Sequence, residues 1–391
     1  MTNVNTHIHT PYCFSSFESI SQAVSMAKQQ NISVLGINDF NTTEGYTEFA
    51  AACQQHHIYP LFNIEFASLD QQDKEKGYYW NDPVNPGVVY LCGKGLNNPP
   101  EFSKDSKNLV SAMWKRTQDR IWKMLDLLNE QIKKRKVELS LDYNQIRNQH
   151  AKNTVREYHI AKKLYFSIIQ KWPIPAHQID IFRQIFDDPS FEADPADKIF
   201  LQDQIHKRLL DTGKPAWVGE NYKSFLSTQQ VRTLILEAGG IPSYPVYTYP
   251  LNDPSDCDKN LSVLAHKLQE LEIFAVEFIP NNTSIELLKK YALFFNRQNF
   301  CVTFGTGHNT SGPSTMIPSA QDNVPFDSEL HQIAYQGACI IAAHQEMRRA
   351  NRPGFINDEG KLNFSANQLK EFIRIGDEAI RKITSGAALK F

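Results

Sequence analysis

The sequence VNTHIH, at residues 4–9, places two histidines at the end of a short strand near the start of the chain. Side chains at alternate positions of a strand share one face, so His7 and His9 are expected to point the same way. Neutral imidazoles in this arrangement suit Zn²⁺, Mn²⁺ or Fe²⁺. The pair alone is a weak signal for a metal, and two exposed histidines at a strand end are the simpler interpretation.

The segments that follow VNTHIH alternate between helical and strand patterns. Apolar residues at helical spacing predict helices over 16–30 and 43–56. Buried strands are expected over 33–37, 61–66 and 88–92. Strands that alternate with helices indicate parallel βα units, whose right-handed crossovers place the helices outside the sheet.

The second half of the chain again alternates between strands and helices. Strands five to seven are expected over 241–247, 274–279 and 301–305, with helices over 257–272 and 283–298 between them. The sequence also predicts a last strand or helix around 340–343 and a C-terminal helix over 365–385.

A long amphipathic helix interrupts the alternation of strands and helices in the middle of the chain. Its apolar residues recur every three or four positions from Val110 to Ile132, and another helix is expected over 154–170. The basic run at 133–136 is interpreted as a solvated helix end, with a phosphate or nucleic-acid contact as the alternative. We therefore divide the chain into a first part of the barrel (1–102), an α-helical insertion (103–230), a second part of the barrel (231–350) and a C-terminal linker and helix (351–391).

Composition narrows the classes of partner. The chain has 391 residues, a formal net charge of −2 and six scattered cysteines without a CxxC pair. A nearly neutral chain has no global field that attracts nucleic acid or an anionic membrane. No apolar run approaches the ~18 residues that span a bilayer, and the N-terminus lacks the pattern of a signal peptide. We expect a cytoplasmic protein with a small-molecule partner, no nucleic acid and no membrane.

Further polar residues follow the predicted strands. Asp39 ends the second strand, Glu65 ends the third, and His308 follows the seventh. In a βα barrel the active site forms where the strands end, so these side chains are expected to converge with His7 and His9. Burying a carboxylate such as Glu65 among phenylalanines is costly unless it meets a cation or a donor. The alternative is that Asp39 and Glu65 only cap the segments that follow them.

The stretch from His7 to Glu65 resembles the signature of the PHP (polymerase and histidinol phosphatase) family. The shared features are the HxH, a tyrosine in the following turn, a strand ending in an acidic motif with a glycine six residues on, and a strand ending in a Val-Glu-like pair. Here these are His7 and His9, Tyr12, Asn38-Asp39-Phe40-Asn41 with Gly45, and Ile64-Glu65. Later matches are Gly239-Gly240-Ile241-Pro242, Gly305-Thr306-Gly307-His308, and Val155–Leu164 with Arg156 and His159. The resemblance covers residues 1–345 and implies a distorted (β/α)7 TIM-like barrel.

The resemblance also implies a divalent metal, Zn, Mn or Fe, held by His7, His9, Glu65 and His308. Asp39 is expected to orient a ligand histidine, and His308 to be a further ligand or an acid–base group, so both are predicted catalytic residues. Family members usually bind three ions, but about five ligand positions differ here, so fewer than three are expected. These positions are occupied by Phe14, Phe40, Tyr90, Tyr244 and Gly307.

Three other candidates lie outside this set. Arg156 and His159 are predicted to reach over the barrel mouth and bind an anionic group such as phosphate. A histidine packed between domains is the alternative for His159. His344 ends an apolar run and could face the same rim.

The sequence thus predicts a metal-dependent hydrolase in which a metal-activated water attacks a phosphoester of a small molecule. The alternative is a non-catalytic PHP-like protein that has lost its metal sites. In that case the aromatic replacements fill the former metal space, and the protein binds a small ligand or a protein partner.

Overall fold

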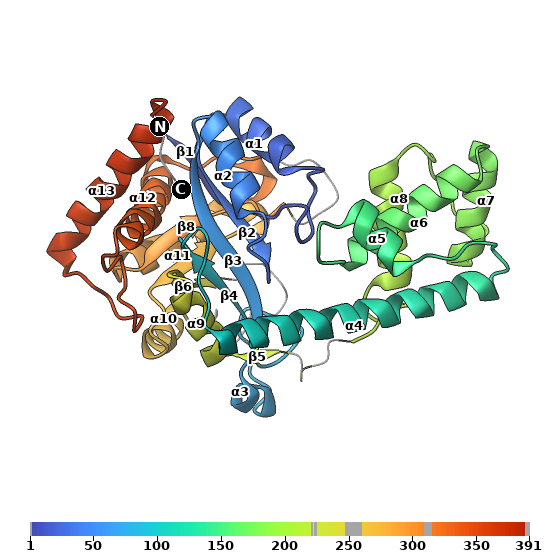
Figure 1. The fold of residues 1–391 in the computed structure, drawn as a ribbon, viewed down its shortest axis with the longest axis horizontal. Helices are drawn as coiled ribbons and strands as arrows, with labels where there is room; N and C mark the ends of the chain where they lie inside the picture. The colour runs from blue at the N-terminus through green and yellow to red at the C-terminus, as the bar shows by residue number, and fades with distance from the viewer. Residues whose placement is uncertain (1, 220–221, 223–224, 247–259, 309–314, 388–391) are drawn as a thin grey trace.

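A computed structural model describes the chain except for residues 1, 220–221, 223–224, 247–259, 309–314 and 388–391. One sheet forms its centre, and each strand of the main path falls where the apolar pattern predicts one (Figure 1). Tyr247 and residues 257–259, at the limits of two predicted elements, lie outside the described residues. The strands are β1 (Asn3–Ile8), β2 (Ile32–Phe40), β3 (Tyr59–Leu69), β4 (Val88–Lys94), β6 (Ile241–Pro245), β7 (Ala275–Phe278) and β8 (Cys301–Phe304).

The sheet curves into a nearly closed barrel. Its strand order is β1-β2-β3-β4-β6-β7-β8, and the two-residue strand β5 (Leu226–Ser227) pairs with β3. The first and last strands meet at a parallel bridge between Ile8 and Gly307. His9 N–H donates to the Gly307 carbonyl at 2.8 Å, and Gly307 N–H donates to the His7 carbonyl at 3.0 Å. The seam therefore runs beside the two histidines, and the predicted distorted barrel is confirmed.

The prediction of parallel strands throughout is wrong for β4. This strand runs antiparallel to both β3 and β6. The connection from β3 to β4 contains only the five-residue helix α3 (Gln71–Glu75), and Asp70 N–H donates to the Gly87 carbonyl at 2.8 Å. That bond brings the two ends of the connection together, so β4 returns as in a hairpin instead of after a full crossover helix.

Capping decides where the helices around the barrel begin. Helix α1 starts at Ile20, because the Ser19 side chain accepts a hydrogen bond from Gln22 N–H; the prediction placed the start at residue 16. Helix α12 settles the alternative at 340–343 in favour of a helix. The helices around the barrel are α1 (Ile20–Gln29), α2 (Tyr46–Gln55), α9 (Thr228–Glu237), α10 (Leu261–Glu270), α11 (Ile285–Arg297), α12 (Ser328–Arg349) and α13 (Ala366–Thr384).

A second group of helices stands beside the barrel. Helix α4 (Lys104–Lys134) runs from the barrel into this group (Figure 1). One apolar cluster fills the barrel, and a separate cluster of residues between 121 and 216 fills the helical group. The limits 103 and 230 of the insertion remain a prediction. The other helices of the group are α5 (Tyr143–His150), α6 (Glu157–Lys171), α7 (Pro175–Phe186) and α8 (Lys198–Ile205).

Across the described part of the chain, no helix combines the length and the apolar character that crossing a bilayer requires.

Candidate metal centre

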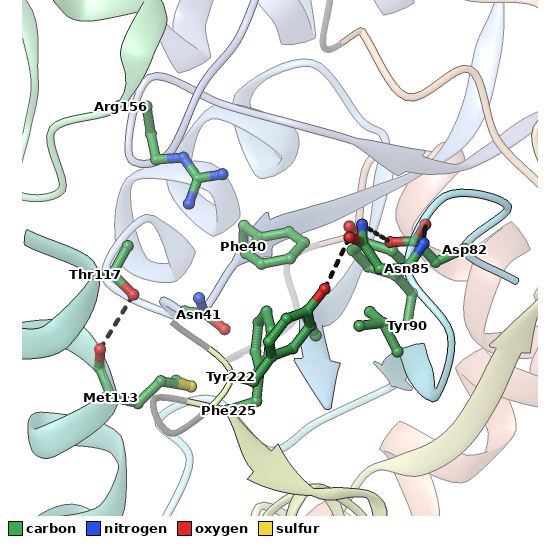
Figure 2. Close-up of a pocket in the computed structure, with 12 residues that line it drawn as sticks. Phe40, Asn41, Asp82, Asn85, Tyr90, Met113, Thr117, Arg156, Tyr222 and Phe225 are labelled. Atoms are coloured by element: carbon green, nitrogen blue, oxygen red, sulfur yellow. Dashed lines mark hydrogen bonds between the residues drawn. The ribbon is translucent and has the colours of Figure 1, made fainter. Parts of the chain in front are cut away.

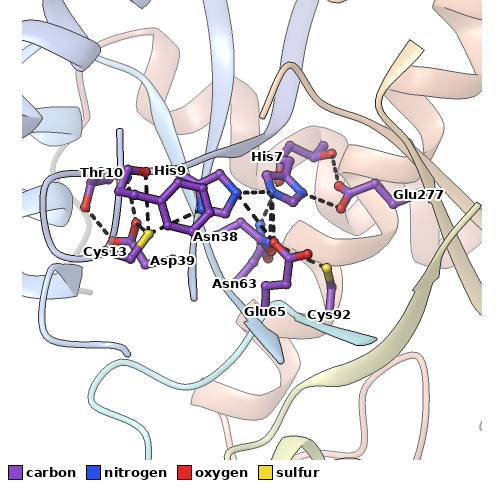
Figure 3. Close-up of polar contacts among 12 residues, drawn as sticks. His7, His9, Thr10, Cys13, Asn38, Asp39, Asn63, Glu65, Cys92 and Glu277 are labelled. Carbon is purple, nitrogen blue, oxygen red and sulfur yellow. Dashed lines mark hydrogen bonds and ion pairs between the residues drawn. The ribbon is translucent and has the colours of Figure 1, made fainter. Parts of the chain in front are cut away.

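His7, in β1, and His9, just after its end, are both buried, and the hydrogen-bond partners of each ring fix its tautomer (Figure 3). His7 Nδ1 lies 2.6 Å from Glu277 Oε2. An ionised carboxylate only accepts hydrogen bonds, so Nδ1 carries the proton, and Nε2 has a lone pair that faces Asn38 Nδ2 at 3.1 Å. His7 is therefore prepared to offer Nε2 to a cation.

His9 is oriented through Cys13 and Asp39. The His9 Nδ1 atom lies 3.4 Å from Cys13 Sγ, and the Cys13 thiol donates to Asp39 Oδ1 at 3.0 Å. Burial raises the pKa of the Cys13 thiol well above its ordinary value, so the thiol keeps its proton. Cys13 Sγ then accepts from His9 Nδ1–H, and His9 also presents a lone pair at Nε2.

Asp39 acts through these partners and does not cap a helix. Its carboxylate accepts from Thr10 N–H at 2.6 Å and from the Thr10 hydroxyl at 2.5 Å, in addition to the Cys13 thiol. Burial raises the pKa of Asp39 to about 6, although these donors oppose the rise. This arrangement agrees with the expected role of orienting a ligand histidine, here His9.

Three potential ligand atoms converge on one point. The Nε2 atoms of His7 and His9 lie 3.3 Å apart, and Glu65 Oε2 lies 3.6 Å from the first and 3.5 Å from the second. Four ligands at bond lengths of about 2.0–2.1 Å around a tetrahedral ion lie roughly 3.3–3.4 Å apart. Two lone pairs and a carboxylate would repel one another without a cation, so this donor set fits one divalent ion.

Glu65 lies within its strand and not at its end, which corrects the prediction. Strand β3 continues to Leu69 because it pairs with β4 as far as Val88. Burial raises the pKa of Glu65. The side chain is 14% exposed, whereas those of His7 and His9 are almost completely buried, so the centre opens on the Glu65 side.

A buried ion pair lies behind His7. Lys94 Nζ lies 2.7 Å from each carboxylate oxygen of Glu277, and both side chains are fully buried. The hydroxyl of Thr6 also donates to Glu277, at 3.1 Å. Burial alone would raise the pKa of Glu277, but Lys94 and His7 outweigh burial and lower it to about 2. The carboxylate that fixes the His7 tautomer is thus kept ionised.

Asn38 joins this pair to His7. Lysine only donates, so the Asn38 Oδ1 atom, 3.0 Å from Lys94 Nζ, must be the acceptor, and this contact fixes the amide orientation. Asn38 Nδ2 then faces His7 Nε2 at 3.1 Å and Cys92 Sγ at 3.5 Å. Asn38 keeps an acceptor in Cys92 when an ion takes the His7 lone pair.

The aromatic residues at the altered family positions form a row at the mouth of the barrel. The Phe14 ring stacks on His9 with centroids 4.7 Å apart. Phe40 follows at 6.3 Å from Phe14, and Tyr90 at 6.1 Å from Phe40. The row therefore lies beside His9 and leaves the space between the three ligand atoms to a cation. Tyr244 packs elsewhere, against Trp80.

Arg156 lies over this aromatic row. Its guanidinium carbon is 5.3 Å from the centroid of Phe14 and 5.4 Å from that of Phe40, within cation–π range. Figure 2 shows it beside Phe40 at a pocket that Tyr90 and Tyr222 also line. Arg156, which directly precedes helix α6, therefore lies near the barrel mouth, and anion binding by Arg156 and His159 remains a prediction.

His159 has a local partner in addition. Its Nδ1 atom accepts from Arg156 N–H at 2.9 Å, which stabilises the first turn of α6. Burial lowers the pKa of His159 to about 3, so the ring is neutral. It lines a cleft of about 360 Å³ between the barrel and the helical group, together with Lys152, Lys162 and other residues.

His308 is close to the seam but is not in the ligand group that the described residues form. Its Nδ1 atom lies 2.6 Å from the Thr306 hydroxyl, and its ring packs 4.7 Å from Phe17. Its predicted roles as ligand and acid–base group remain predictions.

His344 does not face the rim. Its Nε2 lies 2.7 Å from the Gly239 carbonyl, and its Nδ1 accepts from Phe355 N–H at 3.0 Å. The imidazole is therefore a neutral bridge between helix α12 and two loops. Burial lowers its pKa to about 4.

This buried bridge makes stability depend on pH. The unfolded His344 has a pKa of about 6.5, so below that pH the unfolded state binds more protons than the folded state. Unfolding free energy should fall as pH drops from about 6.5 to about 4, by about 3 kcal/mol from this residue. Chemical denaturation at several pH values should show that the unfolding free energy of His344→Gln falls less steeply with decreasing pH than that of the wild type. His266→Gln, at an exposed position, should show the same pH dependence as the wild type. Equal slopes for all three would refute this assignment.

Sequence reasoning missed Glu277, Lys94, Cys13 and Cys92 as parts of the centre. The first two are charged residues within predicted apolar strands, at 274–279 and beside 88–92. The cost of burying a charge, which singled out Glu65, applies equally to them. Nothing in the sequence distinguishes the two cysteines from core cysteines.

Comparisons with known proteins agree with this geometry. Residues 5–165 match the family model of the PHP domain. A candidate metal-dependent phosphoesterase from Bifidobacterium adolescentis has a TM-score of 0.54 at 14% identity, covering 85% of this chain and 95% of that one. An amidohydrolase from Chromobacterium violaceum, with bound sulfate and no metal, has a TM-score of 0.51 at 15% identity, covering 85% and 97%. No curated protein matches the chain.

The two solved structures share the barrel fold, and in this chain the described residues bring histidines, carboxylates and cysteines together in groups that could hold a metal ion. Within the chain, residues 5–165 match the PHP domain, which confirms the resemblance drawn from the N-terminal motifs.

Proposed function

We propose that the chain hydrolyses a phosphoester of a small molecule with one divalent ion held by His7, His9 and Glu65. The convergence of two imidazole lone pairs and one carboxylate oxygen within 3.6 Å carries this proposal. An ion bound there would supply Lewis acidity, which activates water and polarises a phosphoryl oxygen.

The side chains around these three give the centre its geometry. Glu277 holds the His7 tautomer, and the Cys13 and Asp39 chain holds that of His9. Partners of this kind orient metal-binding histidines and raise their basicity. The side chains of His7 and His9 are almost completely buried, whereas that of Glu65 is 14% exposed, so substrate would approach from the Glu65 side.

Arg156 gives the reason to favour a phosphoester. A guanidinium is planar, is always charged and matches the oxygens of a phosphate group. Packing on Phe14 and Phe40 fixes it at the mouth, one ring away from His9. The aromatic row beside it offers flat apolar surfaces to the rest of the substrate.

Elemental analysis of protein purified without chelator tests the metal site first. We expect one Zn, Mn or Fe per chain, and in His7→Ala less than about one tenth of that content, because a lost ligand should cost at least as much affinity as the 10–100-fold of a lost supporting partner. His266→Ala, at an exposed position on α10, is the matched control and should keep the ion.

The same samples are then assayed with p-nitrophenyl phosphate. Hydrolysis that follows metal content would support the proposal. Wild-type protein without metal, even after anaerobic reconstitution, would refute it and favour a non-catalytic protein that binds a ligand at the aromatic row.

A further inference from the structure

We propose that the Lys94 ammonium permanently neutralises a second group of potential metal ligands, so that the barrel holds one divalent ion and not two. This inference rests on the proposed metal site and concerns the residues behind it. Lys94 would act as a positioning residue, since it touches Glu277 and Asn38 and lies away from the barrel mouth.

The second group consists of His7, Cys92 and Glu277. One ligand atom from each lies within 4.8 Å of the others, and all three residues are buried. By its donor types this group could hold a metal as well as the first. Lys94 Nζ lies 2.7 Å from both oxygens of its carboxylate, and Cys92 and Lys94 stand at alternate positions of β4, on one face of the strand.

In this tautomer His7 serves only the first group, so a second ion would have to bind Glu277, Cys92 and Asn38 Oδ1. The His7 Nδ1–H is donated to Glu277, and only Nε2 has a lone pair for a metal. Asn38 Oδ1 accepts from Lys94, so the one amide oxygen near the second group is also engaged with the ammonium. Every oxygen and nitrogen donor of the second group thus has a partner that a second ion would have to displace.

The net charge of the centre also indicates one divalent ion. Among the described residues at the centre, the carboxylates are Asp39 and Glu277, which are buried, and Glu65, which is 14% exposed, and the buried cation is Lys94. Three negative charges and one positive charge leave two negative charges, which one divalent ion neutralises. A second ion bound to an ionised Cys92 would leave the barrel with one uncompensated positive charge, a costly state in a low-dielectric interior.

The third group, His9 with Cys13 and Asp39, is also engaged. The Asp39 carboxylate accepts from Thr10 and Cys13, and Cys13 accepts from His9. These groups support His9 from behind, on the nitrogen opposite to the one that faces Glu65.

Cobalt reconstitution of the full chain tests the role of Lys94. Chelator-treated wild type and Lys94→Ala are dialysed against Co²⁺, and bound cobalt is measured by elemental analysis together with the near-ultraviolet spectrum. We expect one ion and no thiolate-to-cobalt band in the wild type, because its three ligands contain no sulfur. We expect two ions and a thiolate band in Lys94→Ala, and loss of that band in Lys94→Ala/Cys92→Ser. Lys361→Ala, which removes an exposed lysine paired with Glu359, should bind one ion.

The outcomes separate this inference from the proposed function. Two ions in the wild type, or one ion in the wild type and also only one in a folded Lys94→Ala, would overturn the role of Lys94. No ion in the wild type would refute the proposed hydrolase, yet a single ion with a thiolate band in Lys94→Ala would still support this inference. If Lys94→Ala folds only when cobalt is present, the number of cobalt ions bound per refolded chain tests the role of Lys94. The number of ions bound by the wild type can be measured whether or not the variant folds.

Discussion

Glu277→Gln should lower the free energy of unfolding by about 3–5 kcal/mol, because it leaves the buried Lys94 ammonium without its counter-charge. Both carboxylate oxygens of Glu277 lie 2.7 Å from Lys94 Nζ, and neither side chain reaches solvent. The shape of the side chain is kept, so the loss reports charge and not a cavity. Denaturant titration at about pH 7, with chelator present to remove the effect of a bound ion, measures it.

An exposed pair supplies the control. Lys361 and Glu359 also form an ion pair, at 2.9 Å, but both are largely exposed. Water and salt weaken such a pair, so Glu359→Gln should unfold at the same denaturant concentration as the wild type. Equal midpoints for Glu277→Gln and the wild type would show that the buried pair contributes nothing to stability.

A double variant separates stability from metal binding. Lys94→Met with Glu277→Leu replaces the pair by apolar side chains of similar volume, a change that is often neutral for stability. The double variant should therefore recover most of the stability that Glu277→Gln loses. His7 would still lack the acceptor for its Nδ1–H, so affinity for Zn²⁺ should fall by about 10–100-fold. Recovery of both properties would contradict the role of Glu277 in fixing the tautomer.

The barrel could be predicted from sequence because its signals are local. Apolar runs bounded by helical patterns identify β1, β2 and β3, and the VNTHIH segment places two histidines on one face of the first strand. The direction of β4 could not be predicted in this way. It depends on the hydrogen bond between Asp70 and Gly87, which closes a connection whose length alone allows a crossover.

The metal centre was only partly predictable, for a similar reason. His7, His9 and Glu65 follow from position in the strands, whereas the partners that make them ligands come from strands far away in the chain. Glu277 lies 270 positions from His7, and Lys94 lies 183 positions from Glu277. A charged residue in an apolar strand signals that a partner exists, but the sequence does not say which one.

If the proposed function is right, replacing Arg156 should strongly reduce phosphate binding and catalysis. Its guanidinium packs on Phe14 and Phe40, and Phe14 in turn stacks on His9. The side chain is 19% exposed and its Nε lies 3.6 Å from Glu157 Oε2. Since Arg120 also binds Glu157, that carboxylate stays paired when Arg156 binds a phosphate group.

Arg156→Met keeps the apolar contact with the two rings and removes the charge. Hydrogen bonds to charged groups contribute about 1.5–3 kcal/mol, so kcat/KM for p-nitrophenyl phosphate should fall roughly 10- to 150-fold. Inhibition by inorganic phosphate should weaken by a similar factor, while metal content stays at the wild-type value. The bond from Arg156 N–H to His159 is made by the backbone and should survive, so α6 keeps its first turn.

Arg147→Met is the matched control, since Arg147 lies on α5 and packs against Trp114, 5.8 Å from the ring. It should leave both phosphate inhibition and kcat/KM unchanged. A fall in metal content in Arg156→Met would instead place Arg156 among the residues that support the ion. Unchanged phosphate inhibition in Arg156→Met would remove the reason for choosing a phosphoester over another hydrolysable bond.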